Sequence, residues 1–536
     1  MNTFKTIAKS AFLAVLISGC GSTGDIISTP TENIDNSPLK VSELTEAEKH
    51  NWGHLDLVSD TIPGMSVDKA YTALIKKKKG KKVIVAVIDS GIDIDHEDLD
   101  DVIWTNKDEI PNNNIDDDKN GYIDDIHGWN FLGKGYDEQL ELVRILVKGD
   151  KTNPDYERAK AEYEEEYAKW LERKTQYDQI YEQIKNADET LANHLGKKDY
   201  TKEEVNAIKT EDDVLNRSVQ IAKYMFSNNM DSMADAVKEI GSSLESINDR
   251  LNSNLNKDLK GRVTGDDPYD MSTKYYGDGN VKPVKKSESH GTHVAGIIAA
   301  ERNNGLGANG VANNVEIMSI RAVPNGDEYD KDVALAIRYA VDNGAQVING
   351  SFGKSYSPNG EWVRDAITYA SENDVVFVHA AGNDSKDVDT EPNFPDDNIN
   401  GKEISNTYIR VGALSPKYGS NMVASFSNYG KQNVDVFAPG DSVYSTTPEN
   451  EYDTKGGTSM AAPAVAGVAA LIRSYFPDLS AAQVKQVIME SGLAINRKVI
   501  VGGDSEDVRP FADLSKSSRM VNAYNAFIIA AKMAAK

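Results

Sequence analysis

The sequence predicts an α/β protein built around a mostly parallel central sheet, and three observations support this prediction. Residues 83–88 form an unbroken, mostly β-branched apolar run, as in a strand buried on both faces of a parallel sheet. Similar runs recur at residues 315–323, 345–353, 375–383 and 407–414. Segments of helical periodicity, such as 331–343 and 362–373, lie between several of them. Ligands of such folds bind at the carboxyl ends of the strands.

The chain is long and acidic. Its 536 residues exceed the roughly 250–300 at which a single hydrophobic core stops growing, so an insertion or a second domain is expected. The formal net charge of −25 argues against a phosphate-binding surface, which needs clustered Lys and Arg. We therefore expect no nucleic-acid partner.

Residues 1–19 have the features of a bacterial export signal. Lys5 and Lys9 precede an apolar run, residues 11–17, that is too short to span a bilayer. The segment leads into Leu-Ile-Ser-Gly-Cys, which resembles the lipobox of bacterial lipoproteins and contains Cys20, the only cysteine of the chain. The resemblance implies cleavage before Cys20 and a lipid on its thiol. The alternative is a plain secretory signal with a chance cysteine.

Residues 20–51 are rich in Ser, Thr, Asn, Asp and Pro, a composition that predicts a flexible tether. We expect an exported protein held on a bacterial membrane by its lipid, with the outer membrane of a Gram-negative cell as the favoured location. The single cysteine excludes disulfides within the chain and a zinc site made of cysteines.

Residues 135–266 interrupt the alternation of strands and helices. Aromatic and apolar residues recur there every seven positions, at Tyr156, Tyr163, Trp170, Tyr177 and Ile184. A second seam follows steps of four and three, at Met233, Val237, Ile240, Leu244, Ile247 and Leu251. Both patterns are typical of packed helices and predict a coiled-coil-like helical insertion. The remaining folded domain then comprises residues 52–134 and 267–536.

The role of this insertion is open from its sequence. A charged amphipathic helix is usually a solvated face, so we favour a passive spacer or cap over an arm that binds a protein partner. The insertion lies between Asp89 and His290, which makes it a candidate for restricting access to the site that follows.

Three polar residues stand where a buried core would be expected. Ser459 lies between a Gly-Gly turn and a run of small apolar residues that predicts a buried helix beginning near it. His290 begins another helix of small residues, and Asp89 ends the first strand. A serine hydroxyl is a weak nucleophile that needs a base oriented by a third group, which these residue types can supply.

The local motifs together resemble the subtilisin-like serine proteases. Asp89 lies in Asp-Ser-Gly, His290 in His-Gly-Thr-His and Ser459 in Gly-Thr-Ser-Met-Ala-Ala-Pro, in the chain order known for subtilisin. The resemblance implies a three-layer fold in which Asp89 orients the imidazole, His290 acts as general base and acid, and Ser459 attacks the scissile carbonyl. We expect His293 to be structural, hydrogen-bonded within its helix turn.

The resemblance also assigns the surroundings of the nucleophile. The helix that begins near Ser459 would direct its N-terminal dipole at the developing oxyanion, and Asn383 in Ala-Gly-Asn matches the second oxyanion donor. Ser351, Phe352 and Gly353 match the segment whose extended backbone pairs with a polypeptide substrate. Extended or unfolded polypeptides are therefore the expected substrates.

A separate signal predicts a structural calcium ion. Asp116, Asp118, Asn120 and Gly121 match the first half of an EF-hand loop, in which Tyr122 offers a carbonyl. The twelfth position is His127 instead of Glu, so Asp124 or Asp125 has to complete the site, and we favour Asp125. The alternative is an acidic solvated turn.

Two other functions compete with proteolysis. An inactive relative could serve as a binding lipoprotein through its helical insertion, although all four catalytic positions hold the required residue types. A serine esterase or transferase could use the same three residues, but the segment Ser351 to Gly353 argues for peptides. No His-Glu-x-x-His motif supports a zinc peptidase.

Overall fold

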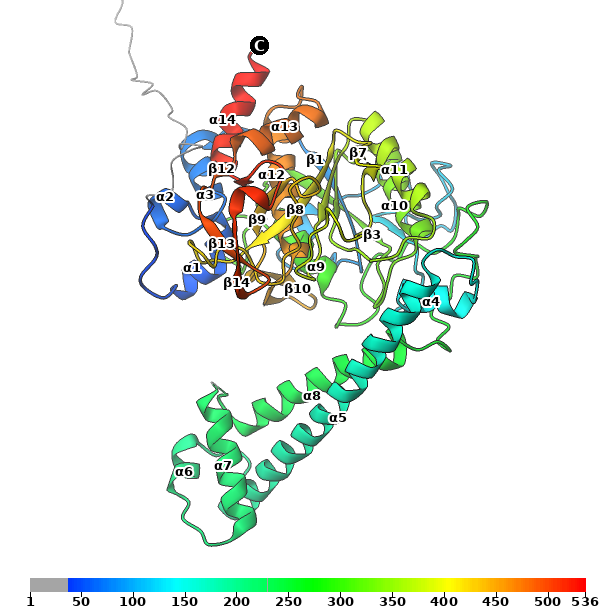
Figure 1. Ribbon diagram of the computed structural model, residues 1–536. Helices are drawn as coiled ribbons and strands as arrows, with labels where there is room; N and C mark the ends of the chain where they lie inside the picture. Colours follow the sequence, from blue (N-terminus) through cyan, green and yellow to red (C-terminus); the bar gives the residue numbers. More distant parts are fainter. Residues whose placement is uncertain (1–36, 229) are drawn as a thin grey trace, which may run out of the picture.

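The computed structural model describes residues 37–228 and 230–536, so the predicted signal peptide and Cys20 lie outside the described residues. Figure 1 shows an α/β core from which a long helical arm projects. None of the helices in the described part is both long and apolar enough to cross a membrane.

A nine-stranded sheet forms the centre of the core. Its strand order is β12-β15-β9-β8-β5-β4-β1-β3-β2, and every neighbouring pair is parallel except β12 and β15. The strands are β1 (Val83–Asp89), β2 (Gly128–Asn130), β3 (Val315–Arg321), β4 (Val347–Gly350), β5 (Val376–Ala380), β8 (Tyr408–Leu414), β9 (Val436–Pro439), β12 (Leu493–Ala494) and β15 (Arg519–Met520). The predicted α/β fold with a mostly parallel sheet is confirmed, because all five predicted apolar runs form central strands.

Helices cover both faces of this sheet. One hydrophobic core joins it to α9 (His290–Ala299), α12 (Thr458–Tyr475), α13 (Ala481–Ser491) and α14 (Ala523–Ala534). A second core joins the opposite face to α10 (Asp330–Asp342) and α11 (Gly360–Glu372). Both faces of the central strands are therefore buried, which explains why their sequences show apolar runs instead of alternation.

Short elements at the edges were not predicted. They are α2 (Leu57–Asp60), α3 (Val67–Ala70) and three hairpins, β6 (Asn398–Ile399) with β7 (Lys402–Glu403), β10 (Val443–Thr447) with β11 (Glu451–Lys455), and β13 (Lys498–Val501) with β14 (Asp504–Pro510). Most of these strands are partly exposed and polar, so they lack a strong hydrophobic pattern.

The tether predicted over residues 20–51 ends earlier in the structure. Helix α1 (Glu46–Asn51) begins at a capping box made by Thr45 and Glu48. The ring of His50 stacks on Tyr444 of β10, with 3.9 Å between ring centroids, and Lys40 pairs with Glu48. Residues 46–51 therefore belong to the folded core, because a local cap and one stacking contact hold a polar helix in place.

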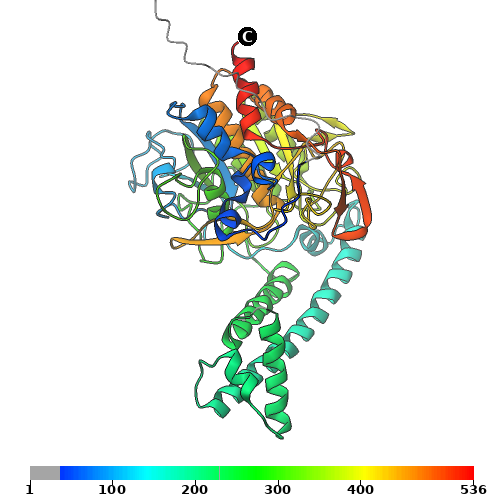
Figure 2. The same ribbon diagram turned by 90° about the vertical axis from the view of Figure 1, so that its left-hand side faces the viewer.

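The insertion forms the arm seen in Figures 1 and 2. Its helices are α4 (Glu141–Lys148), α5 (Tyr156–Leu195), α6 (Lys202–Ala207), α7 (Asp213–Ser227) and α8 (Met233–Asp249), followed by a π-helical turn at Arg250–Asn254. The 40-residue α5 lies along α8 and α7. The arm therefore doubles back on itself and returns the chain to the core beside the point where it left.

Two hydrophobic clusters hold the arm together. At the tip, Ile184 and Leu191 of α5 pack with Val219 of α7 and Met233 of α8. At the root, the cluster contains residues of α4 and Leu251, and the heptad aromatics pack against it: Tyr156, Tyr163, Trp170 and Tyr177. The predicted seams are thus the contacts that stabilise the antiparallel pair.

Candidate active site

Three neighbouring strands bring the predicted site residues to one edge of the sheet. Asp89 ends β1, the segment Ser351 to Gly353 follows β4, and Asn383 follows β5 by three residues. Because β5, β4 and β1 are adjacent and parallel, their carboxyl ends meet at this edge. Helices α9 and α12 begin there and add His290 and Ser459.

Asp89 and His290 are joined by a short hydrogen bond. His290 Nδ1 lies 2.7 Å from Asp89 Oδ1, while Asp89 is 1% exposed and the His290 side chain is 39% exposed. Burial disfavours the charged imidazole, but the Asp89 carboxylate outweighs it and raises the pKa of His290. The bond to Nδ1 fixes the tautomer that leaves Nε2 free to accept a proton.

Close packing sets this geometry. A Cβ at Gly291 would lie 2.3 Å from the carbonyl oxygen of Gly91 and 3.2 Å from Asp89 Cβ. Only glycine at this position lets α9 approach the turn after β1 closely enough for His290 to meet Asp89.

Ser459 occupies the first turn of α12, as predicted. Its Oγ donates to the carbonyl of Ser351 at 3.1 Å, and the Ser351 hydroxyl donates to the carbonyl of Ser459 at 2.8 Å. That second bond has a local cause: Pro463 has no N–H for the carbonyl four residues before it, which is that of Ser459. The backbone of Ser459 is therefore bonded to the segment after β4.

The buried helix packs as its small residues predict. A Cβ at Gly467 would lie 2.6 Å from Val311 Cβ, and Ala461, Ala462 and Ala464 are at most 3% exposed. Larger side chains would push α12 away from the sheet, so this composition keeps Ser459 in a fixed place.

Asn383 is held in a defined orientation by Thr458, the residue before Ser459. Its Oδ1 accepts the backbone N–H of Thr458 at 2.8 Å and the Thr458 hydroxyl at 3.0 Å. Two donors from Thr458 therefore fix the amide oxygen, and the Nδ2 hydrogens on the other side of the amide are available to another acceptor. The preceding Gly382 has φ of 101° and donates its N–H to the Thr458 hydroxyl, so the turn and Thr458 position each other.

Two further histidines are buried near the site. His379 of β5 bonds through Nε2 to the carbonyl of Phe352 at 2.7 Å, and burial lowers its pKa to about 3. A lone histidine inside an apolar strand is the sequence signal that could have indicated this contact with the segment after β4. His293 bonds through Nε2 to the carbonyl of Asp453 on β11, so the predicted bond within its own helix turn is wrong.

Arg321, which sequence reasoning did not single out, connects the parts of the site. Its guanidinium is fully buried and donates to the carbonyl of Ser90 at 2.9 Å and to Glu288 at 2.5 Å. It also donates to the carbonyls of Gly133 and Gly135, at 3.0 and 2.7 Å. One side chain thus binds the turn after Asp89, the approach to His290 and the beginning of the insertion.

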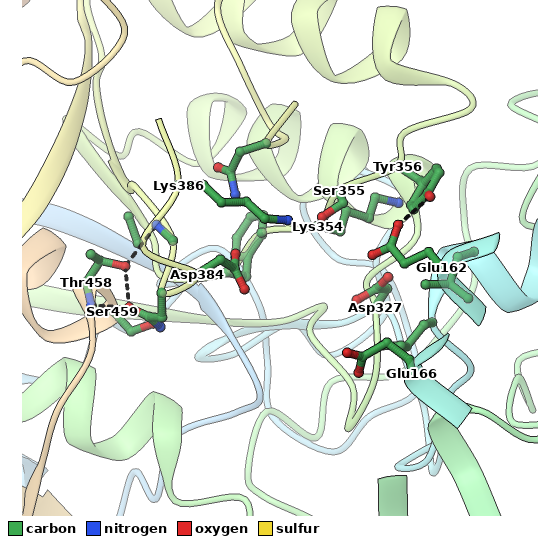
Figure 3. A pocket seen from close by; sticks show the side chains of 18 of the residues that line it. Glu162, Glu166, Asp327, Lys354, Ser355, Tyr356, Asp384, Lys386, Thr458 and Ser459 are labelled. Atoms are coloured by element: carbon green, nitrogen blue, oxygen red, sulfur yellow. Dashed lines mark hydrogen bonds between the residues drawn. The ribbon is translucent and has the colours of Figure 1, made fainter. Parts of the chain in front are cut away.

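A cavity of about 580 Å³ leads away from Ser459 (Figure 3). Thr458, Ser459 and Asn383 line its near end. Residues 352–356 line it further on, and Glu162 and Glu166 of α5 line its far end. A smaller cavity of about 300 Å³ lies on the His290 side of Phe352 and Gly353. Our interpretation of the insertion as a passive spacer did not anticipate its contribution to this cavity.

Three carboxylates gather in the predicted calcium loop. Single oxygens of Glu109, Asp118 and Asp125 all lie within 4.8 Å of one another, and no Lys or Arg in residues 37–228 or 230–536 forms an ion pair with them. Asn120 donates through Nδ2 to both Asp118 and Asp125. Burial raises the pKa of Asp125 to about 6. The oxygen donors and their uncompensated charge fit a hard divalent cation.

Only some of the predicted calcium ligands lie close together in the structure. Asp118, Asn120 and Asp125 come together, and Glu109 joins them without having been predicted. Asp116 lies outside this group of three and accepts the backbone N–H groups of Asn120 and Gly121, much as Glu109 accepts those of residues 117, 118 and 124. The ring centroid of Tyr122 lies 5.0 Å from that of Trp129, and the carbonyl ligand expected from this residue stays a prediction. Asp124, the other candidate, accepts the N–H groups of residues 113 and 114.

Comparisons with known proteins agree on one family. The family model described as "Subtilase family" matches residues 80–507. The thermophilic serine proteinase of Bacillus sp. (strain AK1) is 44% identical over 187 residues, which are 35% of this chain and 43% of that protein. Thermitase of Thermoactinomyces vulgaris is 37% identical over 45% of this chain and 77% of its own length. This chain thus spans less than half of the first relative and about three quarters of the second.

Among solved structures, one titled as proteases from Pseudoalteromonas arctica PAMC 21717 is 32% identical. The match covers 45% of this chain and 70% of that chain, with a TM-score of 0.35.

Proposed function

Because this chain belongs to the subtilase family of serine proteases, we propose that it is an endopeptidase whose catalytic triad is Asp89, His290 and Ser459. The observation that carries the proposal is the 2.7 Å bond between His290 Nδ1 and buried Asp89, at the edge of the sheet where Ser459 begins α12. These three residue types supply the nucleophile, the general base and the group that orients the base in acyl transfer through a serine.

In the proposed reaction the Ser459 hydroxyl leaves its bond to the Ser351 carbonyl and turns to His290. Its proton passes to Nε2 as Oγ attacks the scissile carbonyl carbon, and Asp89 stabilises the imidazolium that forms. The carbon–nitrogen bond then breaks as His290 returns the proton to the leaving amine. A water molecule, deprotonated by His290, hydrolyses the acyl-enzyme and restores Ser459.

The oxyanion of each tetrahedral intermediate would be held by two kinds of donor. Thr458 binds the amide oxygen of Asn383 and leaves its Nδ2 hydrogens available. In the first turn of α12 the N–H groups of Thr458 and Met460 are already bonded, so the helix would contribute the N–H of Ser459. Both are fixed before the substrate arrives, so stabilising the charge requires little reorganisation.

The expected substrates are extended or unfolded polypeptides. The backbone from Ser351 to Gly353 continues β4 beyond its last paired residue, Gly350, and lines both cavities beside the site. A peptide can add to such a segment as a strand, with its scissile carbonyl near Ser459.

We further propose that Glu109, Asp118 and Asp125 hold a structural calcium ion together with Asn120. The ion would supply charge compensation for three carboxylates and would stiffen the loop between β1 and β2. No catalytic step passes through it.

The proposed location is a bacterial membrane, reached through the export signal of residues 1–19 and a lipid on Cys20. Detergent phase partitioning tests this: the wild type should enter the detergent phase, and Cys20→Ser should remain in the aqueous phase.

The test of the proposed activity compares the chain from residue 21 with its Ser459→Ala variant on unfolded casein. Wild type should release peptides that reveal internal cleavage, and the variant should release none. A variant as active as wild type would exclude Ser459 as the nucleophile, and cleavage of model esters alone would favour an esterase.

A further inference from the structure

The root of the insertion is bonded to the substrate segment at three consecutive residues. Lys354 lies 3.0 Å from Glu141 of α4, and the carbonyl of Ser355 accepts from Arg158 at 3.2 Å. Tyr356 donates its hydroxyl to Glu162 at 2.5 Å. These residues follow Gly353 directly, so the insertion is fixed against the wall along which a substrate would lie.

The insertion also supplies part of the cavity that begins at Ser459. Glu162 and Glu166 of α5 line its far end (Figure 3). Arg250, which follows α8, also lines the cavity and lies 3.6 Å from Glu166. A substrate whose scissile carbonyl lies at Ser459 would place the side chain of that residue at the near end, pointing along the cavity. Through this cavity α5, a helix of the insertion, can contact a substrate side chain.

The charges that line the cavity do not cancel. Four carboxylates contribute to it, Glu162, Glu166, Asp327 and Asp384, against three cations, Lys354, Lys386 and Arg250. Two of these cations are already paired. Lys354 lies about 3 Å from Glu141 and Asp330, neither of which lines the cavity, and Arg250 lies 3.6 Å from Glu166.

When the paired groups are set aside, three carboxylates and one cation, Lys386, are left among the residues that line the cavity. Asp327 accepts the backbone N–H of Glu141 at 2.7 Å, and burial raises its pKa, which weakens its charge. Glu162 keeps one oxygen beyond its bond with Tyr356, and Asp384 is exposed beside the oxyanion donor Asn383. The far end and one side of the cavity are therefore negative.

We propose that the root of the insertion makes this protein selective for a basic residue, Lys or Arg, on the acyl side of the scissile bond. Glu162 is the specificity residue of the insertion, and Asp384 assists it from the core. This inference rests on the proposed endopeptidase activity and adds a substrate class to it. The insertion then acts as a wall of the binding site as well as an arm.

The experiment uses the full mature chain and three quenched fluorescent peptides. The peptides differ only in the residue that supplies the scissile carbonyl, which is Arg, Leu or Glu. We expect wild type to give the highest kcat/KM with Arg and the lowest with Glu. Glu162→Gln should lower the ratio of kcat/KM for Arg to that for Leu about tenfold, as one charge of a partly solvated pair is lost.

Matched variants separate charge from structure. Glu162→Gln keeps an oxygen for the Tyr356 hydroxyl, so the root stays bonded. Glu165→Gln removes an exposed carboxylate from the same helix outside the cavity and should not change the ratio. Lys386→Gln removes the opposing cation and should raise the ratio.

The outcomes are distinguishable. If wild type cleaves the Leu or Glu peptide better than the Arg peptide, or if Glu162→Gln keeps the wild-type ratio, the selectivity is wrong and the endopeptidase proposal stands. If wild type cleaves none of the peptides and no casein, the endopeptidase proposal fails first.

Discussion

Ser351 and Ser459 exchange hydrogen bonds, each hydroxyl donating to the other residue's carbonyl, at 2.8 and 3.1 Å. The first residue begins the segment proposed to bind substrate, and the second is the proposed nucleophile. Because Pro463 leaves the Ser459 carbonyl without a helical partner, the pair also completes the hydrogen bonding of α12. Substrate binding and nucleophile position are therefore linked through two adjacent side chains.

Replacing Asn383 with Ala should lower kcat about 10²–10³-fold while KM changes little. The amide oxygen is held by Thr458, so the lost group is the Nδ2 donor, which acts on charge that develops only in the transition state. Steady-state kinetics on a short peptide measure both constants. A change confined to KM would assign Asn383 to ground-state binding instead.

The pH profile should report the bond between Asp89 and His290. Activity needs neutral His290, so it falls as the pH drops through the pKa of that residue, which Asp89 raises. Asp89→Asn removes the carboxylate, so the acidic limb of kcat/KM should move to lower pH and kcat should fall about 10⁴-fold. An acidic limb that stays in place would mean that another group controls it.

Calcium should stabilise the fold through the Glu109, Asp118 and Asp125 cluster. Chelation should lower the Tm of the Ser459→Ala chain, and added calcium should restore it. Asp118→Asn should abolish this response, whereas Asp108→Asn, which removes an exposed carboxylate of the same segment, should keep it. Equal calcium responses in all three proteins would exclude the cluster as the site.

Arg321 should be a major contributor to stability. Arg321→Met leaves Glu288 buried without its partner, which should cost about 3–5 kcal/mol of unfolding free energy. Arg509→Met breaks an exposed pair with Asp507 and should cost about 0–1 kcal/mol. Urea denaturation in the Ser459→Ala background compares them. Similar losses in both variants would contradict the role assigned to Arg321.

The central sheet and the motifs of the candidate site could be identified because their signals are local. A strand buried on both faces shows an apolar run, and Asp89, His290 and Ser459 each lie in a short distinctive motif. The heptad aromatics similarly predicted the arm, since Tyr163 and Trp170 pack along one seam.

The remaining features depend on contacts between distant parts of the chain. Glu109 joins Asp118 through a loop fold, and Arg321 bonds residues almost 200 positions away. Glu162 reaches the cavity because the start of α5 is bonded to the segment after Gly353. Asp116 fits the loop pattern, yet it lies outside the cluster that Glu109 forms with Asp118 and Asp125. Residues that meet only in the folded protein show no periodicity or fixed spacing in the sequence, so they could not be predicted from it.

The most direct test of the proposed triad is covalent labelling with a serine-directed fluorophosphonate, followed by mass spectrometry of the peptides. We expect a single adduct on Ser459 in the wild type, none in Ser459→Ala, and strongly reduced labelling in His290→Ala, which lacks the base. Unreduced labelling of the Ser459→Ala chain, or an adduct on another serine of the wild type, would contradict the proposed triad.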